Sequence, residues 1–228
     1  VRVPIWKKEH YTNGDSGWVN CERHAGHTLP DSTGYYDRQL RLPQVGEEGQ
    51  RRLAESRVLV IGAGGLGSPA LLYLAAAGVG RLGICEFDRL EISNLHRQIL
   101  FDHADVGQPK ASLAAERIRR LNPLVHVETH ELRLTPRNAE ALFRQYDLVL
   151  DCTDNFETKF LINDAAVLSG TPAIFSSIYQ FEGQVQVVDT ARGTACLRCL
   201  WPEPPEAGCV GSCAEVGVVG AVPGIFGS

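Results

Sequence analysis

The chain has 228 residues, which is the size of one large α/β domain or of two small ones. Hydrophobic residues make up 44% of it and charged residues 21%, a composition that supports a sizeable core and excludes wholesale disorder. The formal net charge of −5 excludes the overall basic balance of a dedicated nucleic-acid binder, and no run approaches the roughly 18 apolar residues that a membrane-spanning helix needs.

The amino-terminal part, residues 1–34, is polar and has no hydrophobic period, so we expect a lead-in that is extended or partly disordered. Its Cys21, His10, His24 and His27 fit no metal-site spacing, and we expect them on the surface. Residues 35–228 are predicted to form one domain. The chain contains no methionine, position 1 included, and residues 223–228 are typical of a turn that introduces another element. We therefore expect a chain that is incomplete at both ends.

Helical and strand patterns alternate after residue 44. A helix is expected over 44–56, and short β-branched apolar runs then indicate strands separated by helices. Such alternation predicts a doubly wound, mostly parallel α/β sheet of the Rossmann type with helices on both faces. Residues 182–188 alternate polar and apolar, which predicts an antiparallel extension. The expected strands are 58–61, 81–86, 125–131, 148–151 and 173–176, and the expected helices are 68–77, 111–121 and 156–169.

A glycine-rich loop, Gly62-Ala63-Gly64-Gly65-Leu66-Gly67, joins the first of these strands to a helix. Without side chains the backbone turns tightly and approaches a phosphate, which the amino terminus of a helix favours. Glu86 ends the next strand at about the 20-residue spacing of a ribose-binding acid, and Asp88 follows it. Strand, loop, helix and acid together predict an adenine-nucleotide site. The alternative is tight helix–sheet packing without a ligand, and the kind of nucleotide stays open at this point.

Polar residues after the later strands bear on the nucleotide, because ligands dock at the carboxyl ends of parallel strands. Arg97 and Lys110 supply positive charge for a triphosphate, and Asp154 suits a magnesium ion. Taken singly, the two cations fit solvated surface charges and Asp154 fits the N-cap of the helix at 156–169. As an ordered series they favour ATP.

Several motifs, in the same order, resemble the ThiF/MoeB/HesA family, the bacterial relatives of ubiquitin-activating E1 enzymes. The resemblance covers residues 34–228, and residues 1–33 have no counterpart in it. The motifs are Tyr36-Asp37-Arg38-Gln39, the glycine loop with Ser68, Phe87-Asp88, Ser93-Asn94-Leu95-His96-Arg97-Gln98, Gly107-Gln108-Pro109-Lys110-Ala111, Asp151-Cys152-Thr153-Asp154-Asn155, Cys196-Leu197-Arg198-Cys199 and Cys213-Ala214-Glu215.

The resemblance implies an E1-like fold and an ATP-dependent adenylyltransferase activity. Such an enzyme uses ATP and Mg²⁺ to activate the C-terminal glycine carboxylate of a ThiS- or MoaD-like sulfur carrier, and the acyl-adenylate then receives sulfur in thiamin or molybdopterin biosynthesis. The resemblance also implies a homodimer in which Arg38 reaches into the neighbouring subunit's site. It assigns the phosphates to Gly62, Gly64, Gly65, Gly67, Asn94, Arg97, Gln98 and Lys110, the ribose to Glu86 with Asp88 beside it, and magnesium to Asp154.

Four of the seven cysteines lie near the carboxyl end. Cys196 and Cys199 form a C-x-x-C, half of a tetrahedral Zn²⁺ site, and the resemblance places the other half beyond residue 228. Cys209 with Cys213 is the local alternative for closing that site. The resemblance instead gives Cys213 a catalytic role, as a thioester or acyl-disulfide during sulfur transfer, and a buried structural thiol is the competing interpretation.

The remaining expectations concern partners and place. The cysteine pattern suggests a reducing compartment, so we expect a cytoplasmic protein with no nucleic-acid or membrane partner. A cysteine desulfurase or a rhodanese is the expected sulfur donor. Two other function classes stay open, an NAD- or FAD-dependent oxidoreductase built on the same glycine loop and a non-catalytic nucleotide-binding module.

Overall fold

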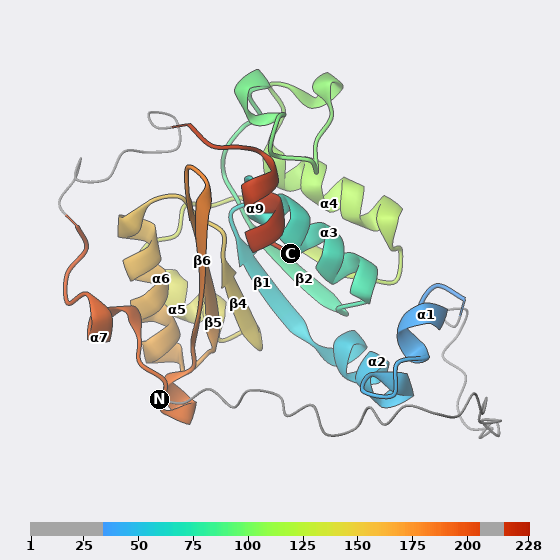
Figure 1. Cartoon of the computed structure of the whole chain (residues 1–228), viewed down its shortest axis with the longest axis horizontal. Coiled ribbons are helices and arrows are strands. Elements are labelled where there is room, and N and C mark those ends of the chain that lie inside the picture. Colours follow the sequence, from blue (N-terminus) through green and yellow to red (C-terminus); the bar gives the residue numbers. More distant parts are fainter. Residues whose placement is uncertain (1–33, 206–216) are drawn as a thin grey trace, which may run out of the picture. The chain divides into compact units, whose positions relative to one another are not determined.

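Six strands form one sheet within residues 34–205 and 217–228, which are the residues that the computed structural model describes (Figure 1). The strand order is β3-β2-β1-β4-β5-β6; β1 to β5 run parallel, and β6 pairs antiparallel with β5. The predicted doubly wound sheet with an antiparallel extension is confirmed. The strands are β1 Arg57–Ile61, β2 Arg81–Cys85, β3 His126–His130, β4 Leu148–Asp151, β5 Ala173–Tyr179 and β6 Glu182–Val188.

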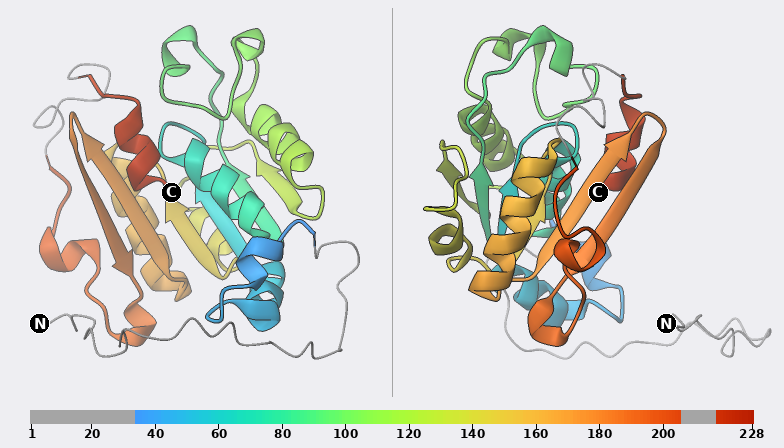
Figure 2. Two further views of the ribbon diagram at one scale, coloured as in Figure 1. Left: turned by 45° about the vertical axis from the view of Figure 1, so that its right-hand side comes forward. Right: turned by 90° about the vertical axis from the view of Figure 1, so that its left-hand side faces the viewer.

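Helices cover both faces of the sheet (Figure 2). Because successive side chains of a strand point to opposite faces, Val58 and Val60 of β1 pack on one side and Leu59 and Ile61 on the other. Within the part of the chain that the structure describes, no helix is both long and apolar enough to cross a bilayer. One face carries α3 Gly67–Ala77, α4 Lys110–Leu121 and α9 Ala221–Phe226, and the other carries α5 Ala139–Phe143, α6 Phe156–Ser169 and α7 Leu197–Leu200.

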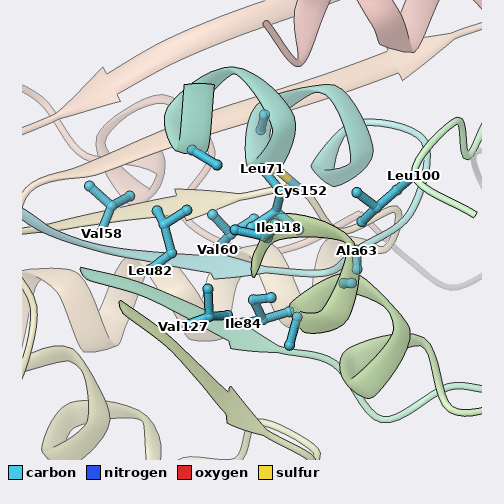
Figure 3. Close-up of a cluster of buried hydrophobic side chains, with 14 of the residues drawn as sticks. Val58, Val60, Ala63, Leu71, Leu82, Ile84, Leu100, Ile118, Val127 and Cys152 are labelled. Carbon is cyan, nitrogen blue, oxygen red and sulfur yellow. The ribbon is translucent and has the colours of Figure 1, made fainter. Parts of the chain in front are cut away.

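The core on the first face is built from neighbouring strands and the two helices above them (Figure 3). Val60, Leu82 and Ile84 of β1 and β2 are fully buried beneath Leu71 of α3 and Ile118 of α4. Burying one such side chain stabilises the fold by about 1.5–3 kcal/mol. This packing fixes the ends of β1 and β2, from which the glycine loop and the next loop emerge.

Two short helices precede the sheet and lie at the amino ends of its strands. Gly80, just before β2, donates its N–H to Leu53 O at 2.9 Å. Tyr36 accepts a hydrogen bond from Asn122 Nδ2 at 2.7 Å, just past the end of α4. These contacts fix residues 36–56 at the edge opposite the carboxyl ends of β1 and β2. The helices are α1 Asp37–Leu40 and α2 Gly46–Glu55.

Among the helices that depart from the sequence predictions are α9 and α5. The expected turn over 223–228 is wrong, because α9 forms there: Pro223 sits in its first turn, where a missing N–H is tolerated, and Phe226 packs on Gly183 of the β5–β6 hairpin. α5 was not predicted, because five residues are too few to show a helical period. It is held by the burial of Leu142 and Phe143 against the second face.

Candidate nucleotide site

The glycine loop joins β1 to α3 at the carboxyl edge of the sheet. Gly62 has a φ of +93°, a conformation that L side chains rarely adopt, and its N–H donates to Cys85 O at 2.9 Å. A Cβ on Gly67, the first residue of α3, would lie 1.9 Å from Gly62 O. Glycine at these two positions therefore lets the loop backbone lie directly against the start of α3, where a phosphate is favoured.

A cavity of about 510 Å³ opens beside this loop, at the carboxyl ends of β2 and β4. A Cβ on Gly65 would lie 3.4 Å from Arg97 Cγ, and one on Gly64 would lie 3.7 Å from Gln98 Nε2, so these two cavity residues adjoin the loop. The wall holds three basic and three acidic side chains. The residues that line it are Asp88, Asn94, Arg97, Gln98, Lys110 and Asp154, all singled out from the sequence, together with Phe87, Arg89 and Glu91.

Phe87, Arg89 and Glu91 are the cavity residues to which no role was assigned from the sequence. The Phe87 ring lies 4.7 Å from the Arg133 guanidinium, and Arg89 Nη1 donates to Gly107 O at 2.8 Å. All three belong to the same loop after β2 as Asp88. Their place between the strand end and Asn94 is the signal that could have found them.

Asn94 and Gln98 are buried polar residues of the cavity wall. Asn94 belongs to the 3₁₀ helix Ile92–Asn94, and its Oδ1 accepts from Glu91 N at 3.1 Å. Gln98 is 4% exposed, and no donor reaches its Oε1 from the residues that the structure describes. A buried acceptor without a donor costs free energy, so Gln98 Oε1 favours a ligand or water that offers an N–H or O–H there.

Lys110 and Arg97 provide positive charge from two different segments. The Lys110 side chain is 7% exposed, and its Nζ lies 3.6 Å from Oδ2 of Asp88, whose own side chain is 55% exposed. An ammonium that is largely removed from water and only loosely paired gains from a nearby anionic ligand. Arg97 is held in place by donating from Nη1 to Ser93 O at 3.0 Å.

A buried ion pair fixes the loop that carries Asp154. Lys159 Nζ donates to Asp151 Oδ2 at 2.7 Å and to Ser176 O at 2.8 Å, which ties α6 to the end of β4 and to the middle of β5. The other carboxylate oxygen of Asp151 accepts from Thr153 N at 3.0 Å. These contacts set the direction of the chain just before Asp154.

The N-cap of α6 is Asn155, whose Oδ1 accepts from Thr158 N at 2.9 Å. The alternative in which Asp154 caps this helix is therefore wrong. Its carboxylate lines the cavity instead, opposite the loop that follows β2.

Glu86, the acid predicted to hold the ribose, is 7% exposed and does not line the cavity. Its carboxylate accepts hydrogen bonds from three backbone N–H groups, those of Ala63, Phe87 and Asp88, at 2.8–2.9 Å. The ribose role stays a prediction, and the loop after β2 presents the exposed carboxylates of Asp88 and Glu91 to the cavity.

Arg38 does not reach this cavity within one chain. It is exposed on α1, at the far edge of the sheet from the loops after β1 and β2 (Figure 1). Its predicted contribution to a neighbouring subunit stays a prediction. Cys213, Cys209, Cys21 and the histidines of the lead-in lie outside the described residues.

The described cysteines fall into two kinds. Cys85 and Cys152 are buried, and burial raises the pKa of each thiol to about 12, so neither is a ready nucleophile. Cys196 Sγ lies 3.8 Å from Cys199 Sγ. Burial opposes ionisation of Cys196, but hydrogen bonds from the backbone of Cys199 and Arg198 outweigh it and lower its pKa. Among the described residues, no group of three or more His, Cys, Asp or Glu side chains is placed to hold a metal ion.

Comparison with known proteins identifies the family of the chain. The model of the ThiF family matches residues 36–228, nearly the whole described part. The chain belongs to the ThiF family. Among proteins of known name, this ThiF-family chain is 57% identical over 197 residues to the sulfur carrier protein adenylyltransferase of Thermus thermophilus, covering 85% of this chain and 73% of that protein. It is 56% identical to the probable adenylyltransferase/sulfurtransferase MoeZ of Mycobacterium tuberculosis, and 50% identical to the adenylyltransferase and sulfurtransferase MOCS3 of Sus scrofa.

The chain covers these longer relatives only in part: 82% of it matches 48% of MoeZ, and 84% of it matches 42% of MOCS3. Solved structures agree on the fold. The chain resembles PaaA with a TM-score of 0.71 at 23% identity, covering 90% of this chain and 64% of PaaA. It resembles MccB of E. coli with a TM-score of 0.73 at 20% identity, covering 86% of this chain and 59% of MccB.

Proposed function

We propose that this ThiF-family chain is an ATP-dependent adenylyltransferase that activates the C-terminal glycine carboxylate of a ubiquitin-like sulfur carrier protein. The observation that carries the proposal is the cavity beside the glycine loop, where Arg97, Lys110 and Asp154 meet from three separate segments. The names of the relatives at 57% and 56% identity support the same activity.

The reaction joins the carrier to AMP. A carboxylate oxygen of the carrier's last residue bonds to the α-phosphorus of ATP, the bond from that phosphorus to the oxygen that bridges to the β-phosphate breaks, and pyrophosphate leaves with that oxygen and the bonding electrons. Negative charge therefore moves onto pyrophosphate, where fixed cations stabilise it. Arg97 and Lys110 supply those cations, and the loop amides at the start of α3 hold the phosphates.

Magnesium fits the donor set of the cavity. Mg²⁺ in phosphate-transfer sites is bound through one or two carboxylates plus the substrate's phosphates, and this wall carries the carboxylates of Asp154 and Asp88. Asp154 would hold the ion, which when bound neutralises phosphate charge. The ribose hydroxyls bind at the acids that follow one another at the end of β2, Glu86 with the more exposed Asp88 beside it.

Zinc fits the pair Cys196 and Cys199. Zn–S bonds of about 2.3 Å at tetrahedral angles hold two sulfurs about 3.8 Å apart, which is the separation observed here. In this proposal the pair supplies two of four ligands of a structural site. Metal analysis of the purified protein tests it: one zinc per chain is expected, and retention of that zinc in Cys199→Ser would contradict it.

The wider assignment belongs to the same proposal. Residues 35–228 form the adenylation domain of a cytoplasmic homodimer, with Arg38 of each subunit completing the other's site. The carrier is ThiS- or MoaD-like, its sulfur comes from a cysteine desulfurase or a rhodanese, and Cys213 takes part in the transfer. The product serves thiamin or molybdopterin biosynthesis.

Carrier-dependent exchange of labelled pyrophosphate into ATP tests the activity. A ThiS- or MoaD-like carrier that ends in Gly-Gly should support exchange, and the same carrier without its last glycine should not. Folded protein that binds MgATP but gives no exchange with any such carrier would favour a non-catalytic nucleotide-binding module.

Thermal unfolding separates the oxidoreductase alternative. A ligand at about 100 times its Kd stabilises a protein by about 2.7 kcal/mol, so MgATP should raise the melting temperature while NAD and FAD leave it unchanged. The reverse result would overturn the proposed function.

A further inference from the structure

The short helix α1 carries Arg38 but has no fully buried residue of its own. Arg38 is exposed, and within the part of the chain that the structure describes no hydrogen bond or ion pair engages its guanidinium. A helix of four residues is not stable by itself, because isolated helices shorter than about 12–15 residues are marginal in water. Contacts from outside α1 must therefore hold it in place.

The residue after Arg38 anchors α1 to the last turn of α3. Gln39 donates from Nε2 to Ala77 O at 3.0 Å and also to Gln50 Oε1. Gln50 lies on α2, is 1% exposed, and donates from its own Nε2 to Ala77 O at 3.1 Å. Because the last carbonyls of a helix have no partner within it, Ala77 O is available to both amides.

The second anchor is Tyr36, which is 6% exposed and directly precedes α1. Its hydroxyl oxygen accepts from Asn122 Nδ2 at 2.7 Å, and the same amide nitrogen donates to Ala75 O, also at 2.7 Å. Asn122 is fully buried, and its Oδ1 accepts from Leu124 N at 3.1 Å. The amide of Asn122 is therefore bonded on both sides, and it joins Tyr36 to the last turn of α3.

Both anchors meet where α3 ends. A Cβ on Gly78, the residue after α3, would lie 2.6 Å from Gln50 Nε2 and from Tyr36 Oη, so glycine is what makes room for these polar groups. Buried polar groups cost free energy unless they are bonded, so this network favours a single arrangement of α1. Arg38 is thus an exposed cation on a backbone that is fixed from both sides.

We propose that Tyr36 and Gln39 are positioning residues, which hold Arg38 where a second copy of the chain uses it in its nucleotide cavity. The proposal rests on the proposed function for the site that two subunits share. Fixing the arginine beforehand saves the conformational entropy that a mobile segment would lose on reaching the neighbouring site. Since a misplacement of about 1 Å can lower a rate by about a hundredfold, removal of an anchor should be measurable.

The first measurement needs no activity. The ¹⁵N order parameter of the Arg38 amide should be about 0.85 in the unaltered protein, as for rigid backbone, and should fall below about 0.6 in Gln39→Met. Thr171→Val is the matched control and should leave that order parameter unchanged, because it removes a buried hydroxyl on the other face of the sheet, where it donates to Phe143 O at 3.4 Å. An unchanged Arg38 order parameter in Gln39→Met would overturn the proposal whether or not ATP is the ligand.

Pyrophosphate exchange by mixed dimers is the second measurement. Gln39→Met alone should be about tenfold slower than the unaltered protein. In a dimer of one Gln39→Met and one Lys110→Met subunit, the cavity that keeps Lys110 receives Arg38 from the subunit that keeps Gln39, so about half of the unaltered activity should return. Absence of recovery would show that Gln39 acts on its own subunit's cavity and would overturn the proposal.

The proposed function can fail separately. No exchange by the unaltered protein with any carrier would overturn that function, and the order parameter of the Arg38 amide would still decide whether Gln39 fixes Arg38.

Tyr36→Phe is the second variant, in case Gln39→Met does not fold. It removes a single oxygen atom, and Asn122 keeps its bond to Ala75 O. This variant should also lower the order parameter of the Arg38 amide, and its mixed dimer with Lys110→Met should also regain activity. Failure of Tyr36→Phe in either measurement would contradict the role of Tyr36 as an anchor of Arg38.

Discussion

At the residue scale, the candidate site depends on polar side chains whose burial and hydrogen-bond partners determine whether they can bind a ligand. Lys110 is buried beside an exposed carboxylate, and Gln98 keeps an acceptor that no described residue satisfies. Both features cost free energy in the empty protein and are relieved by an anionic, hydroxyl-bearing ligand. The residue types were readable from the sequence. The sequence could not predict which of two acids, Glu86 or Asp88, faces the cavity. The two stand only two positions apart and differ only in how the loop folds around them.

Removing the Lys110 charge should abolish most activity. Lys110→Met keeps the stem of the side chain but not the cation, and loss of one group that stabilises developing charge lowers kcat by about 10²–10³. Arg117→Met, on an exposed position of the same helix, is the control and should leave the rate unchanged. Pyrophosphate exchange measures both. Equal exchange rates for the two variants would show that Lys110 has no role in the reaction.

At the element scale, the buried pair Lys159–Asp151 ties α6 to the sheet beneath the Asp154 loop. Lys159→Met would leave Asp151 buried without its partner, and breaking a buried pair from one side costs about 3–5 kcal/mol. Arg198→Met is the matched control, because the Arg198–Asp164 pair joins α6 to α7 but is about 40% exposed, so that solvent screening leaves it a much smaller contribution to stability. Urea unfolding compares them. Similar losses of unfolding free energy in both variants would contradict the role of the Lys159–Asp151 pair in holding the Asp154 loop.

The edge strand β3 should make stability depend on pH. Burial lowers the pKa of His130, whose Nε2 lies 2.7 Å from Tyr146 Oη. The unfolded chain therefore binds a proton near pH 6.5 while folded His130 stays neutral, and the free energy of unfolding falls as pH drops below about 6.5. His130→Gln should flatten this slope, and His103→Gln, at an exposed position of the 3₁₀ helix His103–Asp105, should keep it. Denaturant unfolding between pH 7 and pH 5 decides, and an unchanged slope in His130→Gln would refute the assignment.

Element types followed from hydrophobic periodicity wherever the elements were long. The parallel strands and α3, α4 and α6 were predictable because alternation, helical period and the glycine loop agreed. α5 and α9 were not, since each is short and held by tertiary burial: Phe143 in the second core and Phe226 over Gly183. Likewise, the N-cap at Asn155 could not be told from one at Asp154 by residue type alone, since both favour caps.

At the scale of the whole molecule, the cavity is bounded by loops of one chain, and Arg38 lies at the far edge of the sheet from it. If each subunit lends Arg38 to the other, Arg38→Ala and Lys110→Met should both be inactive alone. A mixed dimer of one Arg38→Ala subunit and one Lys110→Met subunit would contain one site with both Arg38 and Lys110. Such dimers should therefore recover part of the activity. No recovery after subunit exchange would contradict a shared site.

The central claim is that the glycine loop and the cations beside it cleave ATP between its α- and β-phosphates. The most direct test uses a carrier whose C-terminal carboxylate is labelled with ¹⁸O, followed by mass spectrometry of the nucleotide that is released. The account predicts AMP carrying one ¹⁸O together with unlabelled pyrophosphate, since the carboxylate oxygen attacks the α-phosphorus and leaves with it. Formation of ADP with the label in inorganic phosphate would contradict it.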